Sequence, residues 1–232
     1  MPSKDPPSEV AKIRNEISNF FRQVDEQGRR LGSASGVYAF YDYDGEPIYV
    51  GQTRESLTAR VGRHLTGRRT DAVAKFVLDP FEVLEIEVWP FYDASQLDDA
   101  ALKAYLNSVE RQVYDLLVAR SRFGAVLNEK VPPETSESVP LPVPSRGRII
   151  PADLYEDRAH PDVRIARRAS TIARLAAGIA ERAVDRGLRE ALRVQTSRLD
   201  DLATARLLDF ADQPREVETD EDATEQTSGL DA

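Results

Sequence analysis

Apolar residues recur along this chain at two different spacings, which predict helices and strands in alternation. Between Ser8 and Leu31 they follow the three-to-four-residue spacing of an amphipathic helix. Two short β-branched and aromatic runs come next, Ser35–Tyr43 and Pro47–Gly51, and Asp44-Gly45 between them is a strong hairpin signal. The first fifty residues therefore predict one helix and one β-hairpin.

Further along, the same reading predicts a helix over Arg54–Leu65 with Thr53 as its N-cap, and a short helix over Asp71–Leu78. A strand is expected over Phe81–Phe91 and a long helix over Ser95–Arg120. Two helices rich in Ala, Leu and Arg follow, at about 162–186 and 188–210. The expected fold class is α/β (α+β), with a small β-sheet flanked by helices and a C-terminal Arg-rich helical hairpin.

Composition changes divide the chain into five segments. Six prolines between Val131 and Pro151 disfavour helix and predict a linker. The segments are an N-terminal helix (1–34), a sheet domain (35–130), a Pro-rich linker (131–157), a helical module that binds DNA or dimerises (158–211), and an acidic tail expected to be disordered (212–232).

Composition also excludes several classes of protein. The chain has 232 residues and no Cys, which excludes a disulfide scaffold, thiolate catalysis and a Cys-ligated zinc site. Only two His residues are present, so a multi-His metal site is not expected. No apolar run approaches the roughly 18 residues that a membrane span needs, and residues 1–20 lack the apolar core of a signal peptide. We therefore expect a cytoplasmic protein without membrane contact.

A net charge of −9 argues at first against a nucleic-acid partner, but the charge is unevenly distributed. The segment 212–232 carries one basic and eight acidic residues, whereas 158–211 carries eleven Arg against seven acidic residues. The overall acidity is therefore compatible with local basic surfaces that bind DNA.

The predicted hairpin brings two phenols together. A two-residue turn at Asp44-Gly45 pairs Phe40 with Tyr49, and Tyr38 then lies diagonally from Tyr49 on the same face of the sheet. These tyrosines are either ordinary strand residues or part of a site.

The next predicted helix is basic. Arg60 and His64 share one face at i, i+4, and no acidic residue occurs from Ser56 to Thr70. This surface is either a solvated helix face or a phosphate-binding surface.

Glu110 borders the apolar stripe of the long helix predicted over Ser95–Arg120, where a carboxylate is costly unless it pairs with an arginine or binds a metal.

Taken together, these residues form a pattern that resembles the GIY-YIG nuclease superfamily. Gly36-Val37-Tyr38 and Tyr49-Val50-Gly51 are similar to its two motif triplets, and Leu127-Asn128 is similar to the end of its module. Some members carry Lys after the second triplet, where this chain has Gln52-Thr53. The resemblance covers about residues 35–130.

The resemblance implies specific roles. Glu110 would bind one divalent ion, Mg²⁺ or Mn²⁺, because these ions prefer oxygen ligands. Arg60 would hold the scissile phosphate. Tyr38, assisted by His64, is the preferred general base and Tyr49 the alternative, while Asn128 would position groups near the site. Either phenol would need its pKa of about 10 lowered by neighbouring cations.

The C-terminal helices have two compatible interpretations. A heptad-like seam of Ile and Ala from Ile165 to Ala183 predicts packing on the sheet domain or on a second subunit in a homodimer. Arginines on the other face of these helices would contact the DNA backbone. The expected DNA-contacting residues are Arg63, Arg68, Arg69, Arg164, Arg167, Arg168 and Arg174.

The sequence therefore predicts a divalent-metal-dependent DNA endonuclease, a hydrolase of phosphodiester bonds acting in restriction, defence, repair or mobile-element biology. The alternative is a DNA- or partner-binding protein that retains the fold without cleaving. A helical oligomerisation protein with a coincidental motif is the third interpretation.

Overall fold

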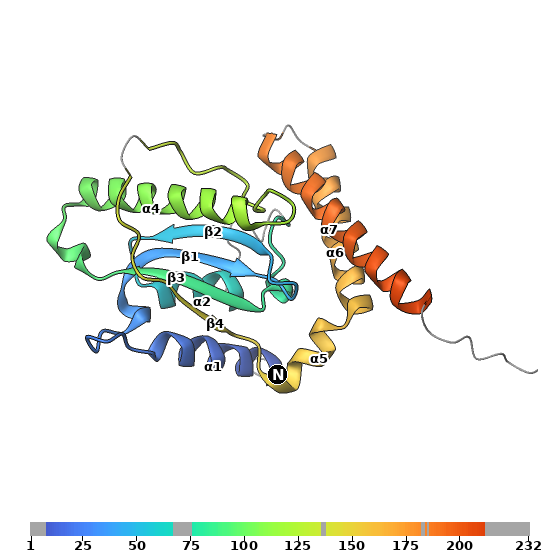
Figure 1. The fold of residues 1–232 in the computed structure, drawn as a ribbon, viewed down its shortest axis with the longest axis horizontal. Helices are drawn as coiled ribbons and strands as arrows, with labels where there is room; N and C mark the ends of the chain where they lie inside the picture. The colour runs from blue at the N-terminus through green and yellow to red at the C-terminus, as the bar shows by residue number, and fades with distance from the viewer. Residues whose placement is uncertain (1–7, 67–75, 136–137, 182–183, 185, 212–232) are drawn as a thin grey trace, which may run out of the picture.

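A computed structural model describes residues 8–66, 76–135, 138–181, 184 and 186–211. Four strands form an antiparallel sheet in the order β2-β1-β3-β4, with helices on both faces and a helical hairpin beside one end of the sheet (Figure 1). The strands are β1 (Ser35–Tyr41), β2 (Pro47–Thr53), β3 (Glu85–Phe91) and β4 (Ser145–Arg148). The helices are α1 (Ser8–Arg22), α2 (Leu57–Thr66), α4 (Asp99–Arg120), α5 (Ala152–Ala159), α6 (Pro161–Ala180) and α7 (Arg186–Ala211). Three short 3₁₀ turns, Leu31–Ser33, Pro80–Glu82 and Asp93–Gln96, connect these elements.

The mixed α/β class is as predicted. None of the described helices is long and apolar enough to cross a lipid bilayer. The short helix expected over Asp71–Leu78 falls largely on 67–75, and the acidic tail on 212–232; both ranges lie outside the described residues.

The two faces of the sheet carry separate cores. Alternate residues of β1 point to opposite sides, so Tyr38 and Phe40 pack with residues of α1 and α2. Val37, Ala39 and Tyr41 pack on the other side against α4. The buried residues of α4 are Leu102, Leu106, Ser108, Val109, Val113 and Leu117. Of the apolar stripe that the spacing predicts for this helix, Leu116 is only half-buried.

The β1–β2 register is confirmed, although the turn differs from the one expected. Asp42 N–H donates to the Glu46 carbonyl (3.0 Å), which closes a three-residue loop, and Gly45 in this loop takes the left-handed conformation (φ 74°). One step further along the hairpin, an irregularity shifts the pairing by one residue, so Phe40 still faces Tyr49. The longer loop and the irregularity offset each other.

The first helix is shorter than its apolar spacing predicts. It ends at Arg22 because the Asp25 side chain accepts hydrogen bonds from the backbone N–H groups of Gln27 and Arg29, both at 2.9 Å. Such a turn competes with helix formation, and Val24, an apolar residue within the range predicted as helix, is 57% exposed.

The segment expected as a linker (131–157) instead contributes to the sheet. Ser145–Arg148 forms β4, which pairs with β3, and Ala152–Ala159 forms α5. The prolines cluster up to Pro144, and the next residues have the N–H groups that strand pairing requires. The proline count therefore located extended backbone but not its role as an edge strand.

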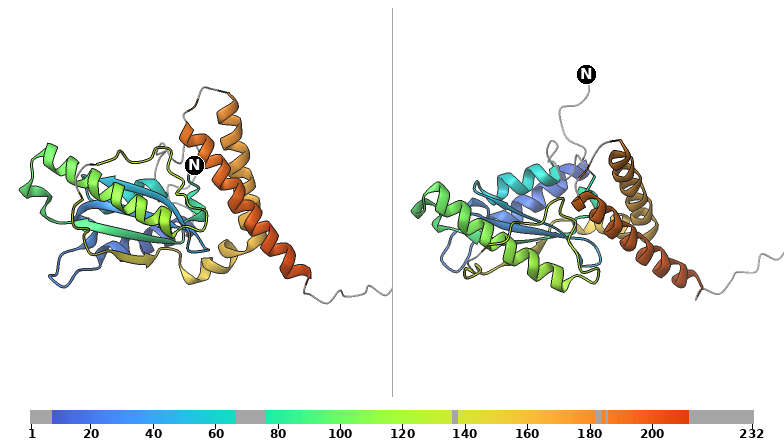
Figure 2. Two further views of the ribbon diagram at one scale, coloured as in Figure 1. Left: turned by 45° about the horizontal axis from the view of Figure 1, so that its top comes forward. Right: turned by 90° about the horizontal axis from the view of Figure 1, so that it is seen from above.

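The α6–α7 hairpin lies beside the end of the sheet where the β1–β2 turn is located, as the rotated views in Figure 2 show. The buried stripe of α6 shares Ile179 with the predicted seam of Ile and Ala but otherwise differs from it. The buried residues are Arg164, Arg168, Thr171, Leu175 and Ile179.

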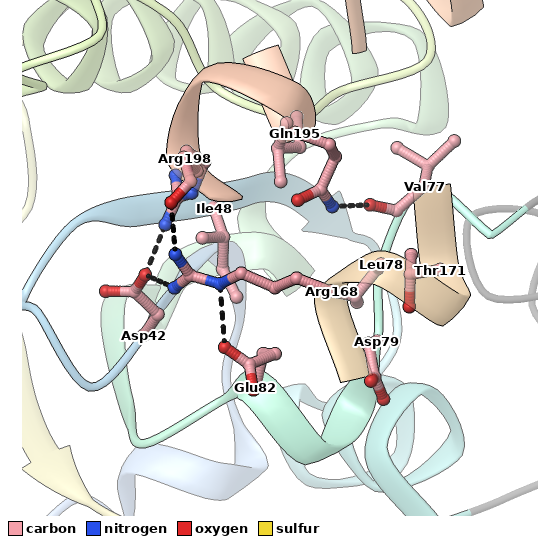
Figure 3. Close-up of a pocket in the computed structure, with 11 residues that line it drawn as sticks. Asp42, Ile48, Val77, Leu78, Asp79, Glu82, Arg168, Thr171, Gln195 and Arg198 are labelled. Atoms are coloured by element: carbon pink, nitrogen blue, oxygen red, sulfur yellow. Dashed lines mark hydrogen bonds and ion pairs between the residues drawn. The ribbon is translucent and has the colours of Figure 1, made fainter. Parts of the chain in front are cut away.

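Ion pairs explain why α6 buries a different face from the one that the sequence predicts. Arg168 Nη2 donates to Asp42 (2.8 Å) and Arg168 Nε to Glu82 (3.1 Å), and Arg198 of α7 also binds Asp42 (Figure 3). Arg164 forms two hydrogen bonds with Asp44. Asp42 and Arg198 are each only 1% exposed, so buried charge pairs attach the helical hairpin to the β1–β2 turn.

Candidate active site

The two motif glycines create space for other groups. Tyr38 of β1 pairs with Gly51 of β2, and a Cβ on Gly51 would lie 2.6 Å from the Tyr38 hydroxyl. A Cβ on Gly36 would lie 2.3 Å from the Trp89 carbonyl oxygen. The Tyr38 phenol therefore lies across Gly51, toward β2, the strand at one edge of the described sheet.

A hydrogen-bond chain surrounds this phenol. Arg60 Nε lies 3.2 Å from the Tyr38 hydroxyl oxygen, and His64 Nε2 lies 3.0 Å from it. Because a guanidinium only donates, the Tyr38 oxygen accepts from Arg60. The direction of its hydrogen bond with His64 is set by the tautomer of the imidazole. The Tyr49 ring lies 6.2 Å from the Tyr38 ring and 5.4 Å from the imidazole, measured between centroids.

Burial keeps these groups neutral. It raises the pKa of Tyr38 well above the ordinary value and raises the pKa of Tyr49 to about 12. Burial, together with the charges of Arg60 and Arg63, lowers the pKa of His64 to about 4. The neighbouring cations do not lower the phenol pKa values overall, contrary to the expectation, because desolvation is the larger effect.

Glu110 approaches the same edge from α4, on the opposite face of the sheet. Gln52 Nε2 of β2 donates to Glu110 Oε2 (3.1 Å) and to Asn107 Oδ1 (2.5 Å). Burial raises the pKa of Glu110 to about 7, although the Gln52 hydrogen bond and the charge of Arg60 act in the other direction. Within the described ranges no cationic side chain forms an ion pair with Glu110, so the arginine partner considered from the sequence is not found there.

Asn107 and Gln52 were not among the predicted site residues. Asn107 precedes Glu110 by three positions on α4, so the two share a helix face. The three-residue spacing of Asn107 and Glu110 could have been recognised in the sequence. The contact between Asn107 and Gln52 could not, because it depends on how α4 packs against β2.

Asn128 lies beside the site but binds backbone. Its side-chain amide donates to the Val50 carbonyl (2.8 Å) and its Oδ1 accepts from the Val50 N–H (3.0 Å). These bonds hold β2 along its outer edge.

The predicted DNA-contacting arginines have different environments. Arg63 is exposed and pairs with Glu55 (Nη1···Oε2 2.8 Å). Arg174 is exposed, with its guanidinium 5.6 Å from the Phe76 ring centroid. Arg68 and Arg69 lie outside the described residues.

The remaining three arginines of α6 require a correction. Arg164 and Arg168 are each 4% exposed and bind carboxylates of the sheet domain, and Arg167 donates to the Phe81 carbonyl (2.9 Å). They hold α6 in place instead of presenting a basic surface, because carboxylates distant in sequence satisfy their charges.

Comparison with known families agrees with this geometry. Residues 34–100 match the family model of the GIY-YIG catalytic domain, a range that includes both tyrosine triplets, Arg60 and His64. A search of curated proteins and a search of solved structures found no match. The match spans less than a third of the chain and ends before Glu110. Over residues 34–100 this chain is therefore similar to the GIY-YIG catalytic domain.

Proposed function

We propose that this protein is a DNA endonuclease that hydrolyses phosphodiester bonds with the help of a divalent metal ion. The observation that carries the proposal is the convergence at β2 of two sets of groups. Arg60, Tyr38 and His64 form one hydrogen-bonded chain, and Glu110 lies close enough for its charge to influence both Tyr38 and Arg60. The first set would bind a phosphate and transfer a proton, and Glu110 would supply a carboxylate.

The first set supports proton removal from an attacking water. The Tyr38 oxygen takes a proton from water while its own proton passes to the Nε2 atom of His64, 3.0 Å away. This relay avoids a free phenolate, which burial disfavours, and it needs the neutral His64 that the low pKa provides. Tyr49 is the alternative base, since its ring lies beside the same imidazole.

The donor set at Glu110 fits Mg²⁺ or Mn²⁺. A half-buried carboxylate without a cationic partner among the described residues, beside an amide oxygen of Asn107, offers the oxygen ligands these ions prefer. A bound ion would stabilise negative charge on the phosphate and the leaving oxygen. Arg60 is half-buried and presents its planar guanidinium toward the same region, which suits phosphate binding.

Cleavage of supercoiled plasmid with Mg²⁺ or with EDTA tests the proposal. We expect Mg²⁺-dependent nicking, loss of nicking in Glu110→Gln, and a rate lower by about 10²–10⁴-fold in Tyr38→Phe with DNA affinity retained. Asp115→Asn is the matched control, because Asp115 is an exposed carboxylate on the same helix and pairs with Arg111.

Three results would contradict parts of the proposal. Unchanged nicking by Glu110→Gln rejects the metal-ligand role. Loss of activity in Tyr49→Phe but not in Tyr38→Phe identifies Tyr49 as the base. DNA binding without cleavage under all conditions supports a binding protein that retains the fold.

A further inference from the structure

We propose that the metal ion is held by three side chains, with Asn107 and Gln52 contributing oxygen ligands beside Glu110. The inference rests on the proposed metal-dependent function and concerns residues outside the motif triplets. It begins with the Gln52 amide nitrogen, which lies between two oxygen atoms, Asn107 Oδ1 at 2.5 Å and Glu110 Oε2 at 3.1 Å.

That nitrogen occupies the position a cation would take. Two oxygens from one helix face converge on a single point, and an N–H donor satisfies both of them there. Oxygen ligands bind Mg²⁺ at about 2.0–2.1 Å. A small inward movement of these two side chains would therefore convert the hydrogen-bonded arrangement into a coordinated one.

The side-chain amide of Gln52 can change from a hydrogen-bond donor to an oxygen ligand of the ion. Rotation of the terminal torsion by half a turn exchanges Nε2 for Oε1. Withdrawal of the side chain by the length of an ion–oxygen bond, about 2.0–2.1 Å, would then make room for the ion and let Oε1 bind it as a third oxygen. A lysine at this position would instead place its own positive charge beside Glu110. The neutral amide leaves the carboxylate charge uncompensated, which favours a cation.

Accessibility also fits a catalytic ion. Gln52, Asn107 and Glu110 are all half-buried, so each side chain keeps part of its surface in solvent. Because Mg²⁺ usually keeps several waters and adds substrate phosphate oxygens, three protein ligands leave the open positions it needs.

Direct metal binding tests the inference independently of cleavage. Mn²⁺ is titrated into the full chain and free Mn²⁺ is measured by electron paramagnetic resonance. We expect Asn107→Leu to weaken Mn²⁺ binding by at least the about 10–100-fold that loss of an outer-shell partner causes. Asn107→Asp and Gln52→Glu should tighten binding, because each adds a charged oxygen.

Gln112→Leu is the matched control. Gln112 lies on the same helix and donates to the Ser108 carbonyl (3.1 Å), away from the Gln52 amide. Its loss should leave Mn²⁺ affinity unchanged. Thermal unfolding in EDTA shows that each variant is folded before its affinity is compared.

The outcomes separate this inference from the proposed function. Wild-type affinity in Asn107→Leu, with binding lost in Glu110→Gln, overturns the role of Asn107 and leaves the nuclease proposal intact. Weakened Mn²⁺ binding in Gln52→Glu shows that residue 52 offers no oxygen to the ion and overturns the proposed role of Gln52. Absence of Mn²⁺ binding in the wild type, or binding that survives Glu110→Gln, overturns the three-ligand site.

Discussion

The buried imidazole of His64 should make the stability of this fold depend on pH in a way that can be calculated. His64 is 3% exposed, forms a hydrogen bond with the Tyr38 hydroxyl and lies near the charges of Arg60 and Arg63. These surroundings favour the neutral ring and lower its pKa to about 4, from an ordinary value of 6.5. In the unfolded chain the same ring returns to its ordinary pKa.

The sign and size follow from proton linkage. Between pH 6.5 and 4 the unfolded chain binds a proton at His64 that the folded chain excludes, so the free energy of unfolding falls as the pH falls. At about 1.36 kcal/mol per pKa unit, the full effect of this ring is about 3 kcal/mol. About 2.5 kcal/mol of it is lost by pH 4.5, a large part of the roughly 5–15 kcal/mol of a typical domain.

Urea denaturation of the wild type and of His64→Gln at pH 7.5 and 4.5 isolates this contribution. Carboxylates titrate in both proteins and cancel in the difference, whereas only the wild type carries the buried imidazole. The wild type should lose about 2–3 kcal/mol more than the variant on acidification. Equal losses, or a smaller loss in the wild type, would refute the argument that His64 is held neutral.

Two further pairs of substitutions, each a test variant with its control, test the packing. Asp42→Ala leaves buried guanidinium groups without their counter-charge and should lower the free energy of unfolding by about 3–5 kcal/mol. Asp153→Ala, which removes an exposed pair, should cost less than about 1 kcal/mol, and equal costs in urea denaturation would contradict the role of burial. Gly51→Ala should cost about 1–3 kcal/mol and reduce plasmid cleavage as much as Tyr38→Phe, because the added methyl meets the phenol. Gly62→Ala, where a Cβ meets nothing within 4 Å, should lower neither stability nor cleavage, and similar losses in both would reject the steric explanation.

Local patterns predicted the parts of the site that depend on neighbours in sequence. The pairing of Phe40 with Tyr49 followed from the hairpin signal, and the structure confirms it. The shared face of Arg60 and His64 followed from helix spacing, and both contact Tyr38. Such features need only the periods of strand and helix.

Contacts between distant segments could not be predicted in the same way. Arg168 and Asp42 are 126 positions apart, and a sequence reading places arginine on the surface because it is seldom buried without a partner. The Gln52–Asn107 contact spans 55 positions and depends on how α4 packs beside β2. The role of β4 depends on an available edge of β3, which its own four residues do not reveal.

The burial of Arg164 and Arg168 changes how the proposed DNA binding should be explained. The charge of the C-terminal module suggested a basic surface, but Arg164 and Arg168 are paired with carboxylates of the β1–β2 turn. That hairpin carries Tyr38 and Tyr49, so these ion pairs hold the strands that position the phenols. A catalytic site gains most from groups fixed before the substrate arrives. Arg164 and Arg168 would therefore contribute to the proposed reaction by fixing the hairpin, and the proposed DNA affinity would come from exposed cations such as Arg174.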